Sequence, residues 1–212
     1  MSKIQAVPRR GILEEIGNAV THGVGSIFAV VALILMLIKS NDALESISAI
    51  IYFVGMFMMF TMSCLYHAFK TDSKVKRLFR RFDYLSIYLL IGATYTPILL
   101  CFIGGILGIV ICSVQWVIIA FGVTMIGVFG PNKKKWIHFS LYMILGWSGI
   151  LFFFELYRDI TFFILILLGG IVYTLGIIPF RLNKKVAHFI WHFFVLFGAI
   201  IQWIGIFITI YL

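Results

Sequence analysis

The sequence predicts an all-α integral membrane protein built as a bundle of seven transmembrane helices. Apolar residues make up 62% of the 212-residue chain, charged residues make up only 12%, and the mean hydropathy is +1.09. A water-soluble domain of this size is not expected to tolerate such a composition. The charges also gather in short patches between apolar runs of about 20 residues, the length at which a helix crosses about 30 Å of hydrocarbon.

The charged patches divide the chain into its elements in order. A mixed segment, residues 1–16, is expected to be a cytoplasmic N-terminal segment, and residues 17–212 are expected to form a single transmembrane domain, because the loops are too short for a separate soluble domain. No small-residue cleavage site follows a short apolar core, so the first span is expected to stay as an anchor. The predicted spans are 17–38, 47–69, 82–103, 107–129, 137–155, 160–180 and 186–211.

Glycines within these spans are expected to mark points where helices touch, because a residue without a side chain lets two backbones approach closely. The glycines predicted to act in this way are Gly25, Gly55, Gly92, Gly122, Gly127 and Gly146.

The basic residues orient the bundle. Short cytoplasmic loops are enriched in Lys and Arg, and fifteen of the seventeen basic residues fall on one side of a seven-helix topology. The other side carries only Lys39 and Arg158, each accompanied by an acidic residue. We therefore expect a cytoplasmic N-terminus, an extracytoplasmic C-terminus and a location in the plasma membrane. A six-helix topology would split the basic groups between the two faces.

The formal net charge of +9 does not indicate a nucleic-acid partner, because the basic residues form four separated loop patches and no continuous stripe. Contact with anionic lipid headgroups is the secondary role that suits such patches. Cys64, Cys101 and Cys112 lie in apolar runs without metal-type spacing, so the sequence implies no disulfide framework.

The most informative polar feature is the pair His188 and His192 at the start of the last span. Residues four apart project from one face of a helix, which is a common way to hold a metal ion. The topology places His67 at the inner end of the second span and Asp83 in the first turn of the third. Four polar groups from three helices are therefore expected at one depth, near the cytoplasmic leaflet.

This set of side chains suits a Zn²⁺ site. Three imidazole ligands with one open position form the arrangement that activates a water, so His67, His188 and His192 are the predicted metal ligands. Asp83 would take a proton from that water or orient it, and Ser63, one turn before His67, would hydrogen-bond the water or a reacting oxygen. An ionised carboxylate near the centre of a span costs at least ~2.5 kcal/mol, so it is a functional candidate by default.

Simpler interpretations stay open for single residues. Asp83 can pair with Arg80 or Arg81 at the start of the helix, where negative charge also suits the helix dipole. His67 taken alone can be a histidine at the membrane interface.

Three further polar residues are placed by the topology. His22, in the inner part of the first span, is either a group beside the site or a packing residue. His138 directly follows a run of three lysines and is expected at the interface. Glu155 falls near the outer end of the fifth span and is assigned no catalytic role.

These residues resemble the pattern of a known family. Ser63-x3-His67, Asp83 and His188-x3-His192 are similar to the signature of the bacterial hemolysin III proteins and the related progestin and adipoQ receptors, which include the adiponectin receptors. The resemblance covers nearly the whole chain. It extends to Glu15-x2-Asn18-x3-His22-Gly23, Phe82-Asp83-Tyr84 and Gly92-x2-Tyr95-Thr96-Pro97.

The resemblance implies seven helices, a cytoplasmic N-terminus, and zinc held by His67, His188 and His192 with Asp83 acting through a zinc-bound water. The wider superfamily includes alkaline ceramidases, so it also implies hydrolysis of a lipid amide, with a membrane lipid as substrate or ligand. The alternatives are a hemolytic, pore-forming protein and a receptor with a structural zinc site. A pore is disfavoured because the strong polar groups gather at the inner end. Hormone-type signalling is disfavoured because the chain lacks the long N-terminal region of the animal receptors. The sequence specifies neither the lipid nor an oligomeric state.

Overall fold

A computed structural model describes residues 8–182 and 184–212, and every regular element in this part of the chain is a helix. Seven spans are long and apolar enough to cross a membrane, which confirms the predicted fold class. The fifth span is the broken one, made of α5, η2 and α6. In chain order the elements are α1 (Ile12–Lys39), α2 (Ala43–Ala68), α3 (Lys74–Pro97), η1 (Ile98–Ile103), α4 (Gly105–Phe129), α5 (Lys135–Gly146), η2 (Ser148–Phe152), α6 (Phe153–Leu156), α7 (Ile160–Arg181), α8 (Ala187–Ile206) and η3 (Phe207–Tyr211).

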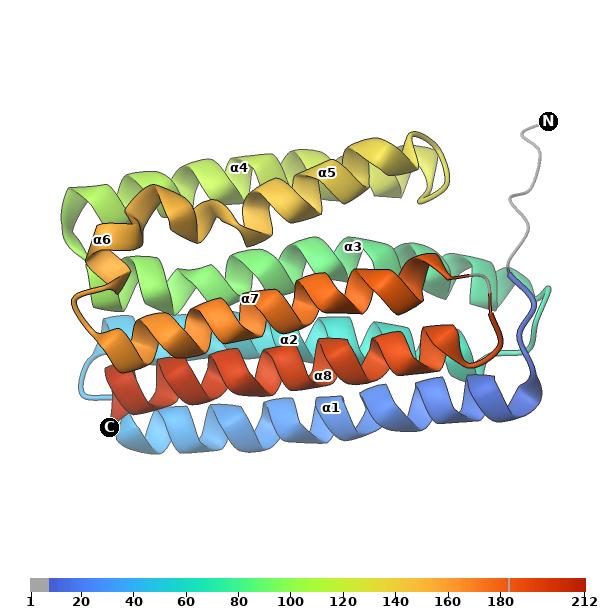
Figure 1. Ribbon diagram of the computed structural model, residues 1–212, viewed down its shortest axis with the longest axis horizontal. Helices are drawn as coiled ribbons and strands as arrows, with labels where there is room; N and C mark the ends of the chain where they lie inside the picture. The colour runs from blue at the N-terminus through green and yellow to red at the C-terminus, as the bar shows by residue number, and fades with distance from the viewer. Residues whose placement is uncertain (1–7, 183) are drawn as a thin grey trace.

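The helices lie side by side along the long axis of the molecule (Figure 1). Chain neighbours pack on one another, and α8 closes the ring by packing on both α7 and α1. The third span, Lys74–Ile103, occupies the centre, because 61% of its most apolar stretch is buried against 17% for the fifth span. Large apolar side chains on the outside of α1 and α4 are exposed, as expected of helices that face hydrocarbon.

The two described ends of the chain lie at opposite ends of the bundle (Figure 1), as an odd number of spans requires. One end of the bundle, which we call the basic end, holds residues 8–11 and three loops. These are the loops between α2 and α3, between α4 and α5, and between α7 and α8. The loops at the other end carry Lys39 and Arg158. The predicted asymmetry of charge is therefore present in three dimensions.

Helix α3 begins at Lys74, well before residue 82, where the sequence predicts the span to start. The Ser73 side chain caps it by accepting a hydrogen bond from the Lys76 backbone N–H at 3.0 Å. The first turns of α3 are basic, so an apolar run does not reveal them. As a consequence Asp83 lies in the third turn of α3, and its predicted place in the first turn is wrong.

Four of the six glycines predicted to be helix contacts are confirmed. A methyl group added at Gly55 would lie 2.2 Å from the Ala93 Cβ and 2.7 Å from the Leu89 carbonyl oxygen, so α2 and α3 meet backbone to backbone there. Side chains of neighbouring helices approach three others in the same way, at Gly25, Gly92 and Gly122. Gly127 and Gly146 face open space, with nothing within 4 Å, so the prediction is wrong for these two.

Gly55→Ala is expected to lower the free energy of unfolding by about 1–3 kcal/mol, and with it the melting temperature, because the added methyl group forces apart two packed backbones. The matched control is Gly127→Ala, which has room for its methyl group and gains from the better helix propensity of alanine. The melting temperatures of both variants in detergent measure the difference. Equal melting temperatures would contradict the packing argument.

Candidate metal centre

Three histidines from two helices converge at the basic end of the bundle. His67 lies in the last turn of α2, and His188 and His192 lie in the first two turns of α8. Each offers one ring nitrogen, and these nitrogens all lie within 4.8 Å of one another. His67 and His192 are buried, and His188 is partly exposed. The predicted convergence is confirmed, and such a cluster can hold a metal ion.

The geometry of the cluster fits a tetrahedral ion. The Nε2 atoms of His188 and His192 are 3.3 Å apart. Two ligands at the usual Zn–N distance of about 2.0–2.1 Å in a tetrahedral site are separated by about 3.3–3.4 Å. The Nε2 atom of His67 is buried and has no hydrogen-bond partner among the described residues, so its lone pair is available to a third bond. His67 would supply the third imidazole, because the ring nitrogens of the three histidines all lie within 4.8 Å of one another.

Glu15 in α1 contacts the Nδ1 atom of the His67 ring, the nitrogen on the other side of the ring from Nε2. Its Oε2 atom lies 2.5 Å from the His67 Nδ1 atom, and the Asn18 amide nitrogen lies 3.3 Å from the same atom. When the Nδ1–H group donates to the carboxylate, the Nε2 lone pair is left pointing into the cluster. A carboxylate partner of this kind fixes the tautomer and the orientation of metal-binding histidines.

Lys76 in the first turn of α3 completes this arrangement. Its side chain is fully buried, and its Nζ atom forms an ion pair with Glu15 at 3.1 Å. It also donates to the carbonyl oxygens of His67 at 3.4 Å and Phe69 at 3.0 Å. Carbonyl groups at the end of a helix have no N–H donor within that helix, so the Lys76 ammonium group supplies the missing hydrogen bonds. Lys76 thus ties α3, the end of α2 and Glu15 together.

The roles of Glu15 and Lys76 were missed by reasoning from the residues alone. The available signal was the spacing of Glu15, Asn18 and His22, which places three polar side chains on one face of α1, and all three are buried. Lys76 gave no signal, because it reads as one more residue of a basic loop.

His22 forms part of the wall of the centre. Its ring stacks on the His192 ring with 3.8 Å between the centroids and an angle of 23°. The side chain is 1% exposed, and neither ring nitrogen has a hydrogen-bond partner within the described part of the chain. His22 therefore lies beside the cluster, where its ring packs against that of His192.

Asp83 lies beside the histidine cluster. Its carboxylate is within electrostatic range of the His67 ring and close to the hydroxyl group of Ser63, which is 1% exposed one turn before His67 on α2. The guanidinium groups of Arg10 and Arg80 are within electrostatic range of the same carboxylate. The structure therefore brings together all five residues that the sequence singles out.

Arg81, the other basic residue considered as a partner of Asp83, turns towards α4. Its guanidinium group donates to the Gly127 carbonyl oxygen at 3.2 Å. Arg80 also reaches this side and donates to the Asn132 side-chain oxygen at 2.7 Å.

Two further predictions concern residues away from the centre. His138 lies in the first turn of α5, directly after the basic loop. Its side chain is only 2% exposed, and its Nδ1 atom lies 3.0 Å from the Tyr88 hydroxyl, because α5 turns this face towards α3. Glu155 lies in α6, pairs with Arg158 at 3.0 Å and takes no part in the centre, as expected.

A separate apolar cavity of about 270 Å³ lies in the other half of the bundle. It adjoins the break in the fifth span after Gly146. One of its few polar lining groups is Gln202, ten residues beyond His192 and therefore about 15 Å further along α8. The lining residues are Tyr95, Gly146, Trp147, Gly149, Ile150, Phe153, Leu156, Phe163, Ile166, Leu167, Gly170 and Gln202.

Comparison with known proteins places the chain in a family. A family model described as "Haemolysin-III related" matches residues 10–203, a stretch that includes all or most of every span. The chain belongs to the hemolysin III family. The match of this hemolysin III protein begins at Arg10 and includes Glu15, His67, Lys76 and the rest of the centre.

Individual proteins are also similar to the chain over most of its length. This hemolysin III protein is 38% identical to Hemolysin-3 of Bacillus cereus over 194 residues, which cover 89% of the chain and 88% of that relative. It is 35% identical to the Hemolysin-3 homolog of Bacillus subtilis (strain 168), with 89% and 90% covered. The Monocyte to macrophage differentiation factor of Homo sapiens is 28% identical over 206 residues, which cover 93% of this chain and 85% of that relative.

Proposed function

We propose that this membrane protein holds Zn²⁺ at His67, His188 and His192 and hydrolyses an amide bond of a membrane lipid there. The observation that carries the proposal is the cluster of three histidine ring nitrogens within 4.8 Å of one another. Neutral imidazole is a preferred ligand of zinc, and a site with three protein ligands keeps a position for water or substrate. Asp83 and Ser63 beside the cluster supply the polar groups that hydrolysis needs.

A bound zinc ion would act as a Lewis acid on the lipid carbonyl and make water a stronger acid. Asp83 acts as the general base: one carboxylate oxygen accepts a proton from the attacking water as the water oxygen bonds to the carbonyl carbon. The same carboxylic acid returns the proton to the nitrogen when the C–N bond breaks. The Ser63 hydroxyl donates a hydrogen bond to the reacting oxygen or to the Asp83 carboxylate. The products are a carboxylic acid and an amine.

The position of the centre limits where the scissile bond lies. We place the centre in the cytoplasmic leaflet of the plasma membrane, with the segment before α1 on the cytoplasmic side, because the loops at this end carry the basic residues that mark cytoplasmic loops. The substrate amide then lies near the membrane surface. A hydrocarbon chain extends from it into the bundle or the bilayer, and the apolar cavity near Gln202 offers space for such a chain.

The metal content of the detergent-purified protein tests this proposal. The wild type is expected to hold close to one zinc ion per chain, and His67→Ala, His188→Ala and His192→Ala are each expected to lose about nine tenths of it or more, since a site left with two ligands binds weakly. The control is His138→Ala, which removes a buried histidine that lies outside the cluster.

Two outcomes would overturn the proposal. One is a folded wild type without zinc, which would favour the pore or receptor functions, and the name Hemolysin-3 of the Bacillus relatives would then point to lysis of cells as the next function to assay. The other is an equal loss of zinc in His138→Ala, which would mean that the histidine variants act through folding.

A further inference from the structure

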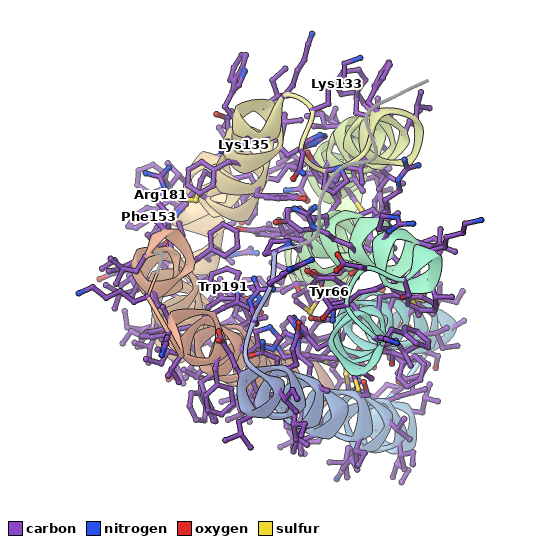
Figure 2. The ribbon with its side chains drawn as sticks, turned by 90° about the vertical axis from the view of Figure 1, so that its right-hand side faces the viewer. Tyr66, Lys133, Lys135, Phe153, Arg181 and Trp191 are labelled. Carbon is purple, nitrogen blue, oxygen red and sulfur yellow. The ribbon has the colours of Figure 1, made fainter. Side chains whose placement is uncertain are left out.

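A short extended segment leads into α1 across the basic end of the bundle. Figure 2 views the molecule from this end, and residues 8–11 cross the middle of the view between Trp191 of α8 and Tyr66 of α2. The segment is attached to the loop between α2 and α3, because the Arg9 guanidinium group forms an ion pair with Asp72 at 3.0 Å. It therefore lies where a ligand would approach the metal centre from the membrane surface.

Arg9 and Arg10 differ sharply in their surroundings. The Arg9 side chain is 80% exposed, whereas that of Arg10 is only 15% exposed. The contacts of Arg10 with the described residues are long: its guanidinium group lies 3.5 Å from the Tyr66 hydroxyl and 3.9 Å from the Glu14 carboxylate. Since a guanidinium group has five N–H donors, these two contacts among the described residues leave most of its donor capacity unused.

Arg10 lies near the metal centre, because it contacts Tyr66, the residue before His67. Its positive charge is within electrostatic range of Asp83, His188 and His192, which lie on α3 and α8. Arg10 belongs to the short segment before α1. A residue near the start of the chain therefore lies near residues from the middle and the end of the chain.

The balance of charge around the centre changes when a metal is bound. Charged side chains of both signs lie beside the histidines: Lys76 pairs with Glu15, and the guanidinium group of Arg10 is within electrostatic range of Asp83. A zinc ion held by the three histidines would add two positive charges to this set. In a partly buried site such a surplus strongly favours a ligand that brings negative charge.

We propose that Arg10 forms a subsite for an anionic oxygen group in the headgroup of the lipid bound at the metal centre. This inference rests on the proposed function, because the surplus charge and the placement of the amide both require zinc at the three histidines. The planar guanidinium fork matches the paired oxygens of a phosphate or carboxylate. The substrate class is then an amide lipid whose headgroup is anionic, with the headgroup held by the segment at the membrane surface.

The experiment compares the retention of an anionic and a neutral lipid by the full-length, zinc-loaded protein. The protein is reconstituted with phosphatidic acid or with diacylglycerol of the same chains, and bound lipid is counted by native mass spectrometry. The wild type is expected to retain phosphatidic acid about 10- to 100-fold more strongly, the range for a charge-assisted hydrogen bond in a partly buried site. Arg10→Gln is expected to remove this preference, and Arg10→Lys is expected to restore part of it.

The matched control is Arg9→Gln, which removes an arginine from the same segment but leaves Arg10 in place. It is expected to keep the preference for phosphatidic acid. Inorganic phosphate is added in a parallel arm: displacement of phosphatidic acid by millimolar phosphate would show that the subsite takes free phosphate and would overturn its assignment to a lipid headgroup.

Zinc content and melting temperature are measured on the same samples. Zinc in the wild type and in Arg10→Gln, with an unchanged lipid preference in Arg10→Gln, would overturn the Arg10 subsite and leave the proposed function standing. Absence of zinc from the folded wild type would overturn both. If Arg10→Gln fails to fold, Arg10→Lys decides, because it keeps the charge but loses the fork, and a preference equal to that of the wild type would contradict a paired-oxygen contact.

Discussion

Asp83→Asn is expected to keep its zinc and to lose hydrolysis. Asparagine has the same shape as aspartate and can still hydrogen-bond to Ser63, but its amide cannot take a proton from water. The loss of a positioned general base typically lowers turnover by about 10²- to 10⁴-fold. Zinc content and the release of amine from a panel of lipid amides, measured on the same preparation, check both halves of this expectation.

This variant separates catalysis from a structural role of the metal. A zinc ion that only joins α2 to α8 would give a wild type without turnover, whatever the state of Asp83. Retained turnover in Asp83→Asn would contradict the assignment of the base. Loss of zinc together with turnover would mean that Asp83 supports the site and does not take part in the chemistry. Ser63→Ala is the companion variant, and a smaller loss of turnover is expected because it removes a hydrogen bond and no proton acceptor.

The fold was predictable from the sequence because a bilayer imposes simple rules. Helix length follows from the thickness of the hydrocarbon, and loop charge follows from the side of the membrane. These two rules set the depth of every residue along its helix. The depths alone predicted that His67 of α2 lies level with His188 and His192 of α8, more than a hundred residues away in the sequence. The ring nitrogens of the three residues do lie close together. The candidate centre could be predicted because its ligands share that depth.

Rotation about the helix axis and the exact start of a helix could not be predicted in the same way. His138 has a depth typical of the interface but faces Tyr88 in the interior. Lys76 belongs to a basic patch in sequence, yet the Ser73 cap starts α3 early enough to carry its side chain into the bundle. Such details follow from packing between helices, which a hydropathy pattern does not record.

Arg10 illustrates a further limit of sequence patterns. It lies in a segment that reads as a polar tail, and its neighbour Arg9 is exposed as a tail residue should be. Its contact with Tyr66 spans 56 residues of sequence. No periodic pattern connects the two residues, so the contact emerges only when the end of the bundle is assembled.

Glu15→Gln is expected to weaken both the folded state and the binding of zinc. Glutamine can still accept a hydrogen bond from His67, but it leaves the fully buried ammonium group of Lys76 without its charged partner. Breaking a buried ion pair by removing one partner costs about 3–5 kcal/mol. Loss of the carboxylate behind a metal ligand lowers metal affinity by about 10- to 100-fold. Melting temperatures in the presence of a chelator measure the first effect, and competition with a zinc dye measures the second.

The double variant Glu15→Gln/Lys76→Met separates these two effects. With both charges removed, no unpaired ion stays buried, so the chelator-treated protein is expected to be more stable than the sum of the two single changes predicts. Zinc affinity is expected to stay as low as in Glu15→Gln, because the His67 ring still lacks its carboxylate. Strictly additive stability losses would show that the pair acts through packing and not through charge. A Glu15→Gln protein that binds zinc as tightly as the wild type would show that the carboxylate does not orient His67.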